Sequence, residues 1–396
     1  MTRKGVWDLQ QTRDKYLQSL WSNDMVMTAW GYGFYGTRGD NSGGNPSGNT
    51  SSPVQIPGAN WSSIGGKISY SSDYFWIQSK TDGTLWAWGR NDKGQLGHNS
   101  LVNYSSPVQI PGTTWSNKIT MGRHSASAIK TDGTLWTWGH GYYGLLGQNN
   151  ASNKVSSPVQ IPGTTWSRAY IGNRSSGGVK TDGTLWMWGS NAYGQLGQNS
   201  ILDSPAWVGI SSPVQVGSDT TWSVVHVGDK NVAAVKTDGT LWTWGYNASG
   251  ALGISVSSNV SRSSPVQVPG TTWSDVWTTI SGAAAIKTDG TLWVWGYNND
   301  GRLGDLTATT SRSSPKQIPG TTWKQFTWVN YGGWQAVKTD GTLWVAGRAN
   351  YGQAGHEYSG DRSSPVQVGS DARWDSVGSW AYGTTALRST LTPSQL

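Results

Sequence analysis

The stretch KTDGTLWTWG, residues 236–245, occurs in six near copies along the chain. Its Asp238-Gly239 pair is typical of a two-residue hairpin turn, because both residues accept a positive φ at low cost. The residues after the turn favour a strand. In that strand Trp242 and Trp244 project from one face, and Leu241 and Thr243 project from the other. The other copies begin at residues 80, 130, 180, 287 and 338.

Two further markers recur with the same spacing of about 50 residues. The SSPVQ or SSPKQ marker begins at residues 51, 105, 156, 211, 263, 313 and 363. The Trp of the TTW-type turn falls at Trp61, Trp115, Trp166, Trp222, Trp273, Trp323 and Trp374. Seven copies of one unit predict a repeat architecture in which neighbouring units bury a shared core.

One unit contains four segments of strand length. These are WSVVHVG (222–228), NVAAVKT (231–237), TLWTWGY (240–246) and the SSPVQV marker. We label them a, b, c and d. Four short strands in each of seven units predict an all-β, seven-bladed β-propeller of four-stranded antiparallel blades. We expect the first Trp of each TLWxW stretch to be largely buried between blades: Trp86, Trp136, Trp186, Trp242 and Trp293.

The two ends of the chain are incomplete in complementary ways. The last unit, residues 374–389, supplies two strands and has no DGTLW turn, whereas residues 22–31 supply a third strand that ends in Trp30-Gly31. We expect strand 26–31 to pair with a strand within 384–390. That pairing would close the ring and remove both free sheet edges.

A glycine-rich link follows each c strand, as in RNDKGQLG (90–97) and SNAYGQLG (190–197). This link, together with TDGTLWxWG, resembles the repeat of the regulator of chromosome condensation (RCC1) family over about residues 22–390. The resemblance implies a seven-bladed propeller. It leaves the function open, since that family includes GTPase exchange factors, a plant ultraviolet receptor and adhesion or scaffold modules.

Differences between the units are concentrated on one predicted side of the disc. The b–c and d–a turns repeat KTDGT and PGTTW, and we call this side the repeat face. The a–b and c–d connections differ from unit to unit, and we call this side the loop face. Rigid scaffolds commonly bind partners through such loops, although loops also diverge without a function. The binding candidates on the loop face are Trp207, Tyr331, Trp334, Arg123, Arg174 and Lys230; packing of its loop onto the disc is the alternative for Trp207.

Several kinds of chemistry lack a sequence signal. The five His residues show no metal-ligand spacing, the repeated Asp residues belong to turns, and the glycine-rich link does not lead into a helix as a phosphate loop does. We therefore expect no enzyme activity, cofactor or metal. No apolar run is long enough to span a membrane, and we expect no nucleic-acid partner. The net charge of +7 suits solubility or an acidic partner.

The N-terminal residues 1–21 differ from the repeats and predict a short amphipathic helix at 9–21. Asp8 and Gln11 resemble a capping box. We expect this segment to dock onto another protein or to cap the fold, with Trp7, Leu9, Tyr16, Leu17 and Leu20 as its contact residues. The predicted organisation is thus a segment 1–21, a propeller 22–390 and a tail 391–396.

A leaderless chain with many Gly, Ser, Thr and Asn residues suggests a virion protein, such as a bacteriophage tail, fibre or baseplate component. In this hypothesis the chain assembles in the host cytoplasm and is present in several copies. Residues 1–21 then bind other virion proteins, and the loop face binds a neighbouring subunit or a host glycan. One alternative is an RCC1-like GTPase exchange factor or chromatin-binding scaffold, which could be cytoplasmic. Another is an ultraviolet sensor based on Trp residues.

Overall fold

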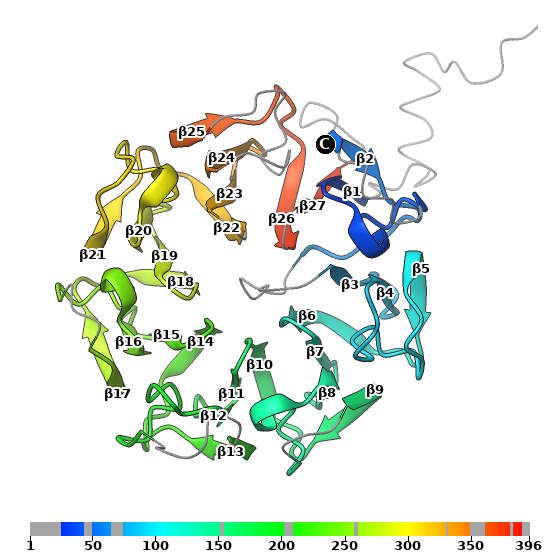
Figure 1. Cartoon of the computed structure of the whole chain (residues 1–396), viewed down its shortest axis with the longest axis horizontal. Coiled ribbons are helices and arrows are strands. Elements are labelled where there is room, and N and C mark those ends of the chain that lie inside the picture. The colour runs from blue at the N-terminus through cyan, green and yellow to red at the C-terminus, as the bar shows by residue number, and fades with distance from the viewer. Residues whose placement is uncertain are drawn as a thin grey trace, which may run out of the picture.

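The chain folds into a ring of seven antiparallel blades around a central axis (Figure 1). A computed structural model describes residues 25–42, 50–64, 74–150, 154–201, 209–256, 260–329, 332–348, 361–380 and 383–389. Six blades have four described strands, and one has three. In the three-stranded blade Trp61 bridges to Lys80, as Trp115 pairs with Lys130 in the next blade. The predicted seven-bladed propeller is confirmed.

The strands run from the axis to the rim in the order a, b, c, d. The a strands are β6 (Trp115–Met121), β10 (Trp166–Ile171), β14 (Trp222–Val227), β18 (Trp273–Thr278), β22 (Trp323–Val329) and β26 (Trp374–Trp380). The b strands are β3 (Phe75–Ser79), β7 (Ser125–Lys130), β11 (Ser175–Lys180), β15 (Asn231–Lys236), β19 (Gly282–Lys287), β23 (Gly333–Lys338) and β27 (Gly383–Ser389). The c strands are β1 (Met25–Gly31), β4 (Leu85–Gly89), β8 (Leu135–His140), β12 (Leu185–Gly189), β16 (Leu241–Gly245), β20 (Leu292–Gly296) and β24 (Leu343–Gly347). The d strands are β2 (Thr50–Gln55), β5 (Tyr104–Ile110), β9 (Lys154–Ile161), β13 (Ile210–Gln215), β17 (Arg262–Val268), β21 (Arg312–Gln317) and β25 (Arg362–Gln367).

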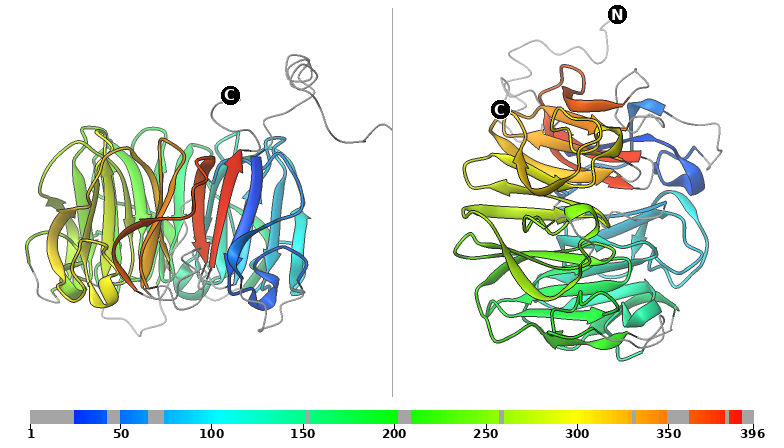
Figure 2. Two further views of the ribbon diagram at one scale, coloured as in Figure 1. Left: turned by 90° about the horizontal axis from the view of Figure 1, so that it is seen from above. Right: turned by 60° about the vertical axis from the view of Figure 1, so that its left-hand side comes forward.

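Short 3-10 helices occur in four of the links after c strands. They are η1 (Phe34–Gly36), η2 (Tyr142–Gly144), η3 (Ala248–Gly250) and η4 (Asn299–Gly301). In Figure 2 (left) η1 lies at the opposite end of its blade from the point where β27 ends. The links therefore belong to the loop face, and β27 ends on the repeat face.

Strands from both ends of the chain build the closing blade, in the order β2-β1-β27-β26. β1 and β27 pair along their full lengths, from Met25 opposite Ser389 to Gly31 opposite Gly383. Figure 1 shows the blue β1 beside the red β27. The predicted pairing of strand 26–31 within 384–390 is confirmed. It leaves neither strand with a free edge in the ring.

The second Trp of each c strand, rather than the first, is the fully buried one. Trp88, Trp138, Trp188, Trp244 and Trp295 are at most 1% exposed. The indole nitrogen of each donates to a carbonyl in the link of the preceding blade, for example Trp244 Nε1 to Gln195 O at 2.9 Å. The first Trp residues pack against the core but are only partly buried, so their burial is less complete than expected: Trp86, Trp136, Trp186, Trp242 and Trp293. They lie closer to the b–c turn, at the end of the blade, where one side of the ring faces solvent.

Each link packs flat against the d strand of the following blade, and this contact requires glycine. Gly94 has φ +78, and a Cβ there would lie 2.7 Å from the Ser156 backbone. The neighbouring Asn99 N–H donates to Ser156 O at 2.8 Å. The glycine-rich link and the SSP marker therefore recur together because they form one contact between blades.

Candidate functional site

The repeat face is a framework in which every residue of KTDGTLW has a structural partner. In one blade the Asp132 carboxylate accepts hydrogen bonds from the Thr134 N–H at 2.9 Å and its hydroxyl at 2.6 Å. The same hydroxyl accepts from Trp136 Nε1 at 2.8 Å. Lys130 Nζ lies 4.8 Å from the Trp115 ring and 4.5 Å from the Trp136 ring. The lysines of this face are thus placed over pairs of indoles, an arrangement that stabilises a cation.

The turns of the repeat face also join one blade to the next. The Trp115 N–H of one blade donates to Gly83 O in the turn of the preceding blade at 3.0 Å. Equivalent bonds join Trp166 to Gly133 and Trp222 to Gly183. These main-chain bonds explain why KTDGT hardly varies: a changed turn would break the contact with its neighbour.

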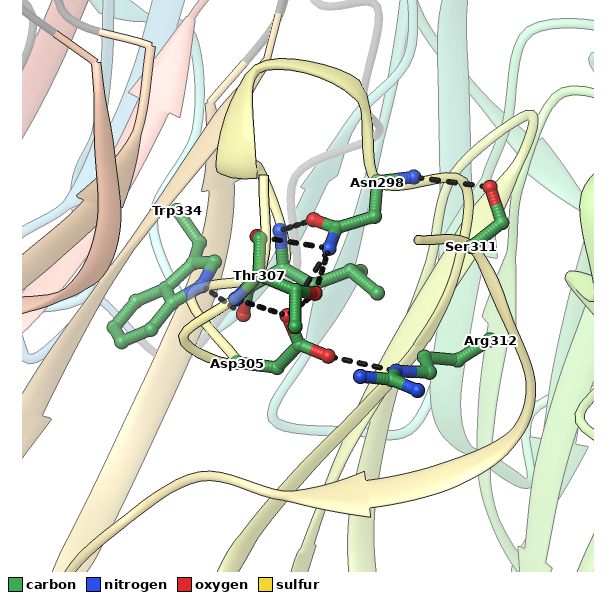
Figure 3. Close-up of polar contacts among 7 residues, drawn as sticks. Asn298, Asp305, Thr307, Ser311, Arg312 and Trp334 are labelled. Carbon is green, nitrogen blue, oxygen red and sulfur yellow. Dashed lines mark hydrogen bonds and ion pairs between the residues drawn. The ribbon is translucent and has the colours of Figure 1, made fainter. Parts of the chain in front are cut away.

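An asparagine side chain fixes the conformation of several links. Asn298 Oδ1 accepts from the Leu303 N–H at 2.9 Å, and its Nδ2 donates to Thr307 O at 3.0 Å. In this link Asn298 also donates to Asp305, which forms an ion pair with Arg312 at 2.8 Å (Figure 3). The same pair of bonds is made by Asn91, Asn191 and Asn247 in their links. These polar residues organise the loops from within.

Trp334 was predicted to bind a partner on the loop face, but it lies in the core. It is 1% exposed and lies opposite Ala346, the residue that replaces the second Trp of that c strand. Its Nε1 donates to Leu303 O at 3.0 Å (Figure 3), a bond to the preceding link like those of the other blades, with the acceptor one residue further along the link. The indole has moved from strand c to the paired position on strand b.

The loop face carries pairs of tyrosines and cations, most of them between adjacent blades. Lys230 Nζ lies 4.8 Å from the Tyr193 ring and 5.5 Å from the Tyr246 ring. Arg174 lies over Tyr143 at 5.8 Å. Further pairs join Arg90 to Tyr35 and Arg302 to Tyr297. The predicted candidates Arg174 and Lys230 therefore belong to one kind of surface, in which a cation is presented beside a ring.

A pocket of about 360 Å³ lies on the loop face where three blades meet. Arg123 and His124 come from the β6–β7 turn, His140 ends β8, and Asn173 and Arg174 come from the β10–β11 turn; Lys93 reaches it from the link after β4. Tyr142 and Tyr143 of η2 form an aromatic wall. Arg123 and Arg174 were predicted, whereas His124 and His140 were not, because 15 intervening residues hide their proximity in the sequence.

The pocket histidines are surrounded by positive charge. Burial, with the charges of Arg123 and Arg90, lowers the pKa of His124 to about 4. Burial and the charges of Lys93 and Lys154 also lower the pKa of His140. Both imidazoles are therefore neutral near pH 7.

The other predicted contact residues lie outside the described residues. These are Trp207 and Tyr331 on the loop face, and Trp7, Leu9, Tyr16, Leu17 and Leu20 with the rest of segment 1–21. The tail 391–396 is likewise outside them. Within the described ranges, no group of three or more His, Asp or Glu side chains is placed to hold a metal ion. No helix in this part of the chain is long and apolar enough to cross a membrane.

The protein is thus a seven-bladed propeller of tandem repeats, in which the repeat face is nearly the same in every blade and the loop face differs from blade to blade. The regulator of chromosome condensation (RCC1) repeat matches residues 82–129, 132–176, 182–235, 238–283 and 289–337, which make up more than half of the chain. The chain belongs to the RCC1 repeat family. A stretch of 32 residues is 56% identical to the protein RCC2 homolog of Danio rerio, and this match covers 8% of the chain and 6% of that relative.

Solved structures share the same fold at low sequence identity. Human WBSCR16 has a TM-score of 0.75 and 18% identity, over 92% of this chain and 98% of that chain. Prp20p from Saccharomyces cerevisiae, described with its binding properties to Gsp1p and histones, has a TM-score of 0.77 and 16% identity, over 94% and 93% of the two chains. Yeast RCC1 (Prp20) bound to Kap60 gives the same TM-score and identity, over 94% and 90%. At these identities the likeness shows the fold alone.

The virion hypothesis is wrong, and with it the expected virion partners, host glycan and virion localisation. The family match and the stretch shared with the RCC2 homolog favour the RCC1-like alternative instead. The polar composition that suggested an adhesin has a structural cause. Asn99, Asn149 and Asn199 adopt φ values of 53, 57 and 54 in the links, a backbone conformation that favours Asn and Gly.

Proposed function

We propose that this chain is a protein-docking propeller of the RCC1 type, which binds a partner through its loop face and performs no bond-making chemistry itself. The observation that carries the proposal is the contrast between the two faces. The turns of the repeat face are committed to bonds between blades, whereas the loop face presents different side chains from each blade. A rigid scaffold with varied loops is a common design for recognition.

Charge favours an acidic partner surface. Arg123 and Lys230 are cations of the loop face, and two of its acids form ion pairs with neighbouring arginines. Asp229 accepts from Arg174 at 3.2 Å, and Asp305 pairs with Arg312 at 2.8 Å. Complementary charge increases the rate of association and selects among partners. Basic proteins such as histones are therefore poor candidates for this face.

A small GTPase is the first candidate partner. The RCC1 family, which the repeats define, includes GTPase exchange factors, and the similar propeller Prp20p is described with its binding to Gsp1p. In that role the propeller would change the affinity of its partner for a nucleotide by contact alone, without a catalytic residue that reacts.

Binding and nucleotide release measured together test this function. The full chain is mixed with purified small GTPases that carry a fluorescent nucleotide, and binding is followed by biolayer interferometry. The variant Arg123→Glu with Lys230→Glu reverses two loop-face charges. The matched control, Lys118→Glu with Lys316→Glu, makes the same charge change at exposed positions of β6 and β21.

We expect the loop-face variant to lose at least tenfold in affinity for its GTPase and the control to keep the affinity of the unmodified chain. Equal binding by both variants would place the interface elsewhere. Binding of histones but of no GTPase would favour the chromatin-scaffold alternative and overturn the proposed partner class.

A further inference from the structure

The pocket where the blades of β3–β5, β6–β9 and β10–β13 meet is lined mainly by basic and hydrogen-bonding side chains. Three cations line it, Lys93, Arg123 and Arg174, together with the imidazoles of His124 and His140 and the amide of Asn173. No carboxylate is among the described residues that line it. We propose that this pocket binds an oxyanion on a side chain of a protein partner, either a carboxylate or a phosphorylated Ser or Thr. The proposal rests on the proposed function for its choice of a protein ligand.

Hydrogen-bond donors dominate the walls of the pocket. Guanidinium groups offer pairs of parallel N–H donors that match the two oxygens of a carboxylate or phosphate, and an ammonium adds a point charge. Such charge-assisted bonds are about twice as strong as neutral ones. A volume of about 360 Å³ holds one side chain and its anionic group. Tyr142, which is 51% exposed and 3.7 Å from the His140 ring, supplies an apolar wall for the methylenes of that side chain.

Two carboxylates just outside the pocket position its cations and restrict the size of the anion that it can bind. Asp92 lies 3.3 Å from Lys93 on one side, and Asp229 lies 3.2 Å from Arg174 on the other. Asn173 Nδ2 also donates to Asp229 at 2.6 Å. These acids hold the cationic side chains in position. They would also repel a chain of consecutive phosphates that extended beyond the pocket, so a single anionic side chain is favoured over a nucleic-acid backbone.

The histidines link binding to pH. His124 faces Arg123, Arg90, Asp92 and His140, and its neighbour His140 faces Lys93, Lys154, Asp92 and Tyr142. A bound anion opposes the surrounding positive charge and so raises the pKa of both imidazoles. Because protons are then taken up on binding, the affinity increases as the pH falls from 7.5 towards 5.

Fluorescence anisotropy with the full chain tests the proposal. Three peptides of identical sequence carry phosphoserine, glutamate or serine at one position, and a single-stranded 12-mer of deoxythymidine serves as the nucleic-acid probe. The pocket variants are Arg123→Ala and His124→Asn with His140→Asn. Lys316→Ala is the matched control, because it removes an exposed cation of β21 that lies outside the pocket.

We expect the phosphoserine or glutamate peptide to bind at least tenfold more tightly than the serine peptide. Whichever of these two peptides binds more tightly shows whether the pocket prefers a phosphate or a carboxylate. Arg123→Ala should reduce the affinity about tenfold and Lys316→Ala less than twofold. For the glutamate peptide, whose charge stays constant in this range, the affinity should rise from pH 7.5 to 6.0, and the double His variant should remove most of that rise.

Three outcomes would overturn the inference. They are equal binding of all three peptides, an equal loss in Arg123→Ala and Lys316→Ala, or tighter binding of the DNA probe with the same dependence on Arg123. Circular dichroism of each variant verifies that a loss of binding is not a loss of fold. Peptide binding without GTPase binding would leave this inference intact and refute the proposed partner class, whereas the reverse would refute only this inference.

Discussion

Moving one indole between two paired strands tests how the blades are held together. Trp334→Ala removes a side chain that is 1% exposed. A buried aromatic side chain covers about 150–250 Å², which at about 25 cal/mol per Å² corresponds to about 4–6 kcal/mol. Large-to-small replacements of buried Trp cost about 3–5 kcal/mol. We therefore expect the free energy of unfolding to fall by roughly 4 kcal/mol.

Restoring the indole on the partner strand should recover much of this loss. The double variant Trp334→Ala with Ala346→Trp recreates the arrangement of the other blades, in which the second Trp of strand c donates to the preceding link. Ala346→Trp alone places two indoles in one site, and overpacking of this kind costs about 1–3 kcal/mol. The double variant should thus be more stable than Trp334→Ala, by about half of the original loss or more.

Urea denaturation, followed by far-ultraviolet circular dichroism, measures the three variants and the unmodified chain. The midpoints are compared at a constant slope, so that a change in midpoint reports stability. If the double variant is no more stable than Trp334→Ala, the indole of Trp334 does not replace the missing strand-c Trp, and the reasoning fails.

Three further predictions concern the framework. Trp138→Ala should lower the urea midpoint more than Trp136→Ala, because only Trp138 is fully buried; an equal effect would contradict the burial argument. The Lys236 ammonium and the Thr221 hydroxyl lower the pKa of Asp219 from 3.8 to about 2, so its carboxylate stabilises the fold above pH about 4 and loses this effect as the pH falls towards 2. Urea midpoints between pH 6 and 2 should therefore fall less steeply in Asp219→Asn, and an unchanged slope would refute this. Asn191→Ala leaves the buried Leu196 N–H without its acceptor and should lower the free energy of unfolding by about 1–3 kcal/mol in the same assay. A change near zero would show that the link keeps its conformation without this side chain.

The sequence alone determined the ring. The Asp-Gly turns, the spacing of about 50 residues and the complementary ends are local signals, and each constrains the backbone wherever it occurs. The division into a repeat face and a loop face follows from strand connectivity, so it too was predictable. The class of protein was not predictable in this way, and the virion hypothesis drawn from composition was wrong. The polar composition of the chain reflects turns such as those at Asn99 and Asn149, which many unrelated proteins share.

Which side chains meet across blades depends on how the blades pack in the ring. Trp242 and Trp244 project from the same face of their strand, yet the contact with the preceding link makes Trp244 the buried one. Trp334 looks like a loop-face residue until its pairing with Ala346 places it in the core. The pocket likewise joins Lys93, His124 and Arg174 from three blades. The physical reason is that the angle and spacing at which rigid sheets pack are set by the whole ring, whereas a turn or a strand is set by its own few residues.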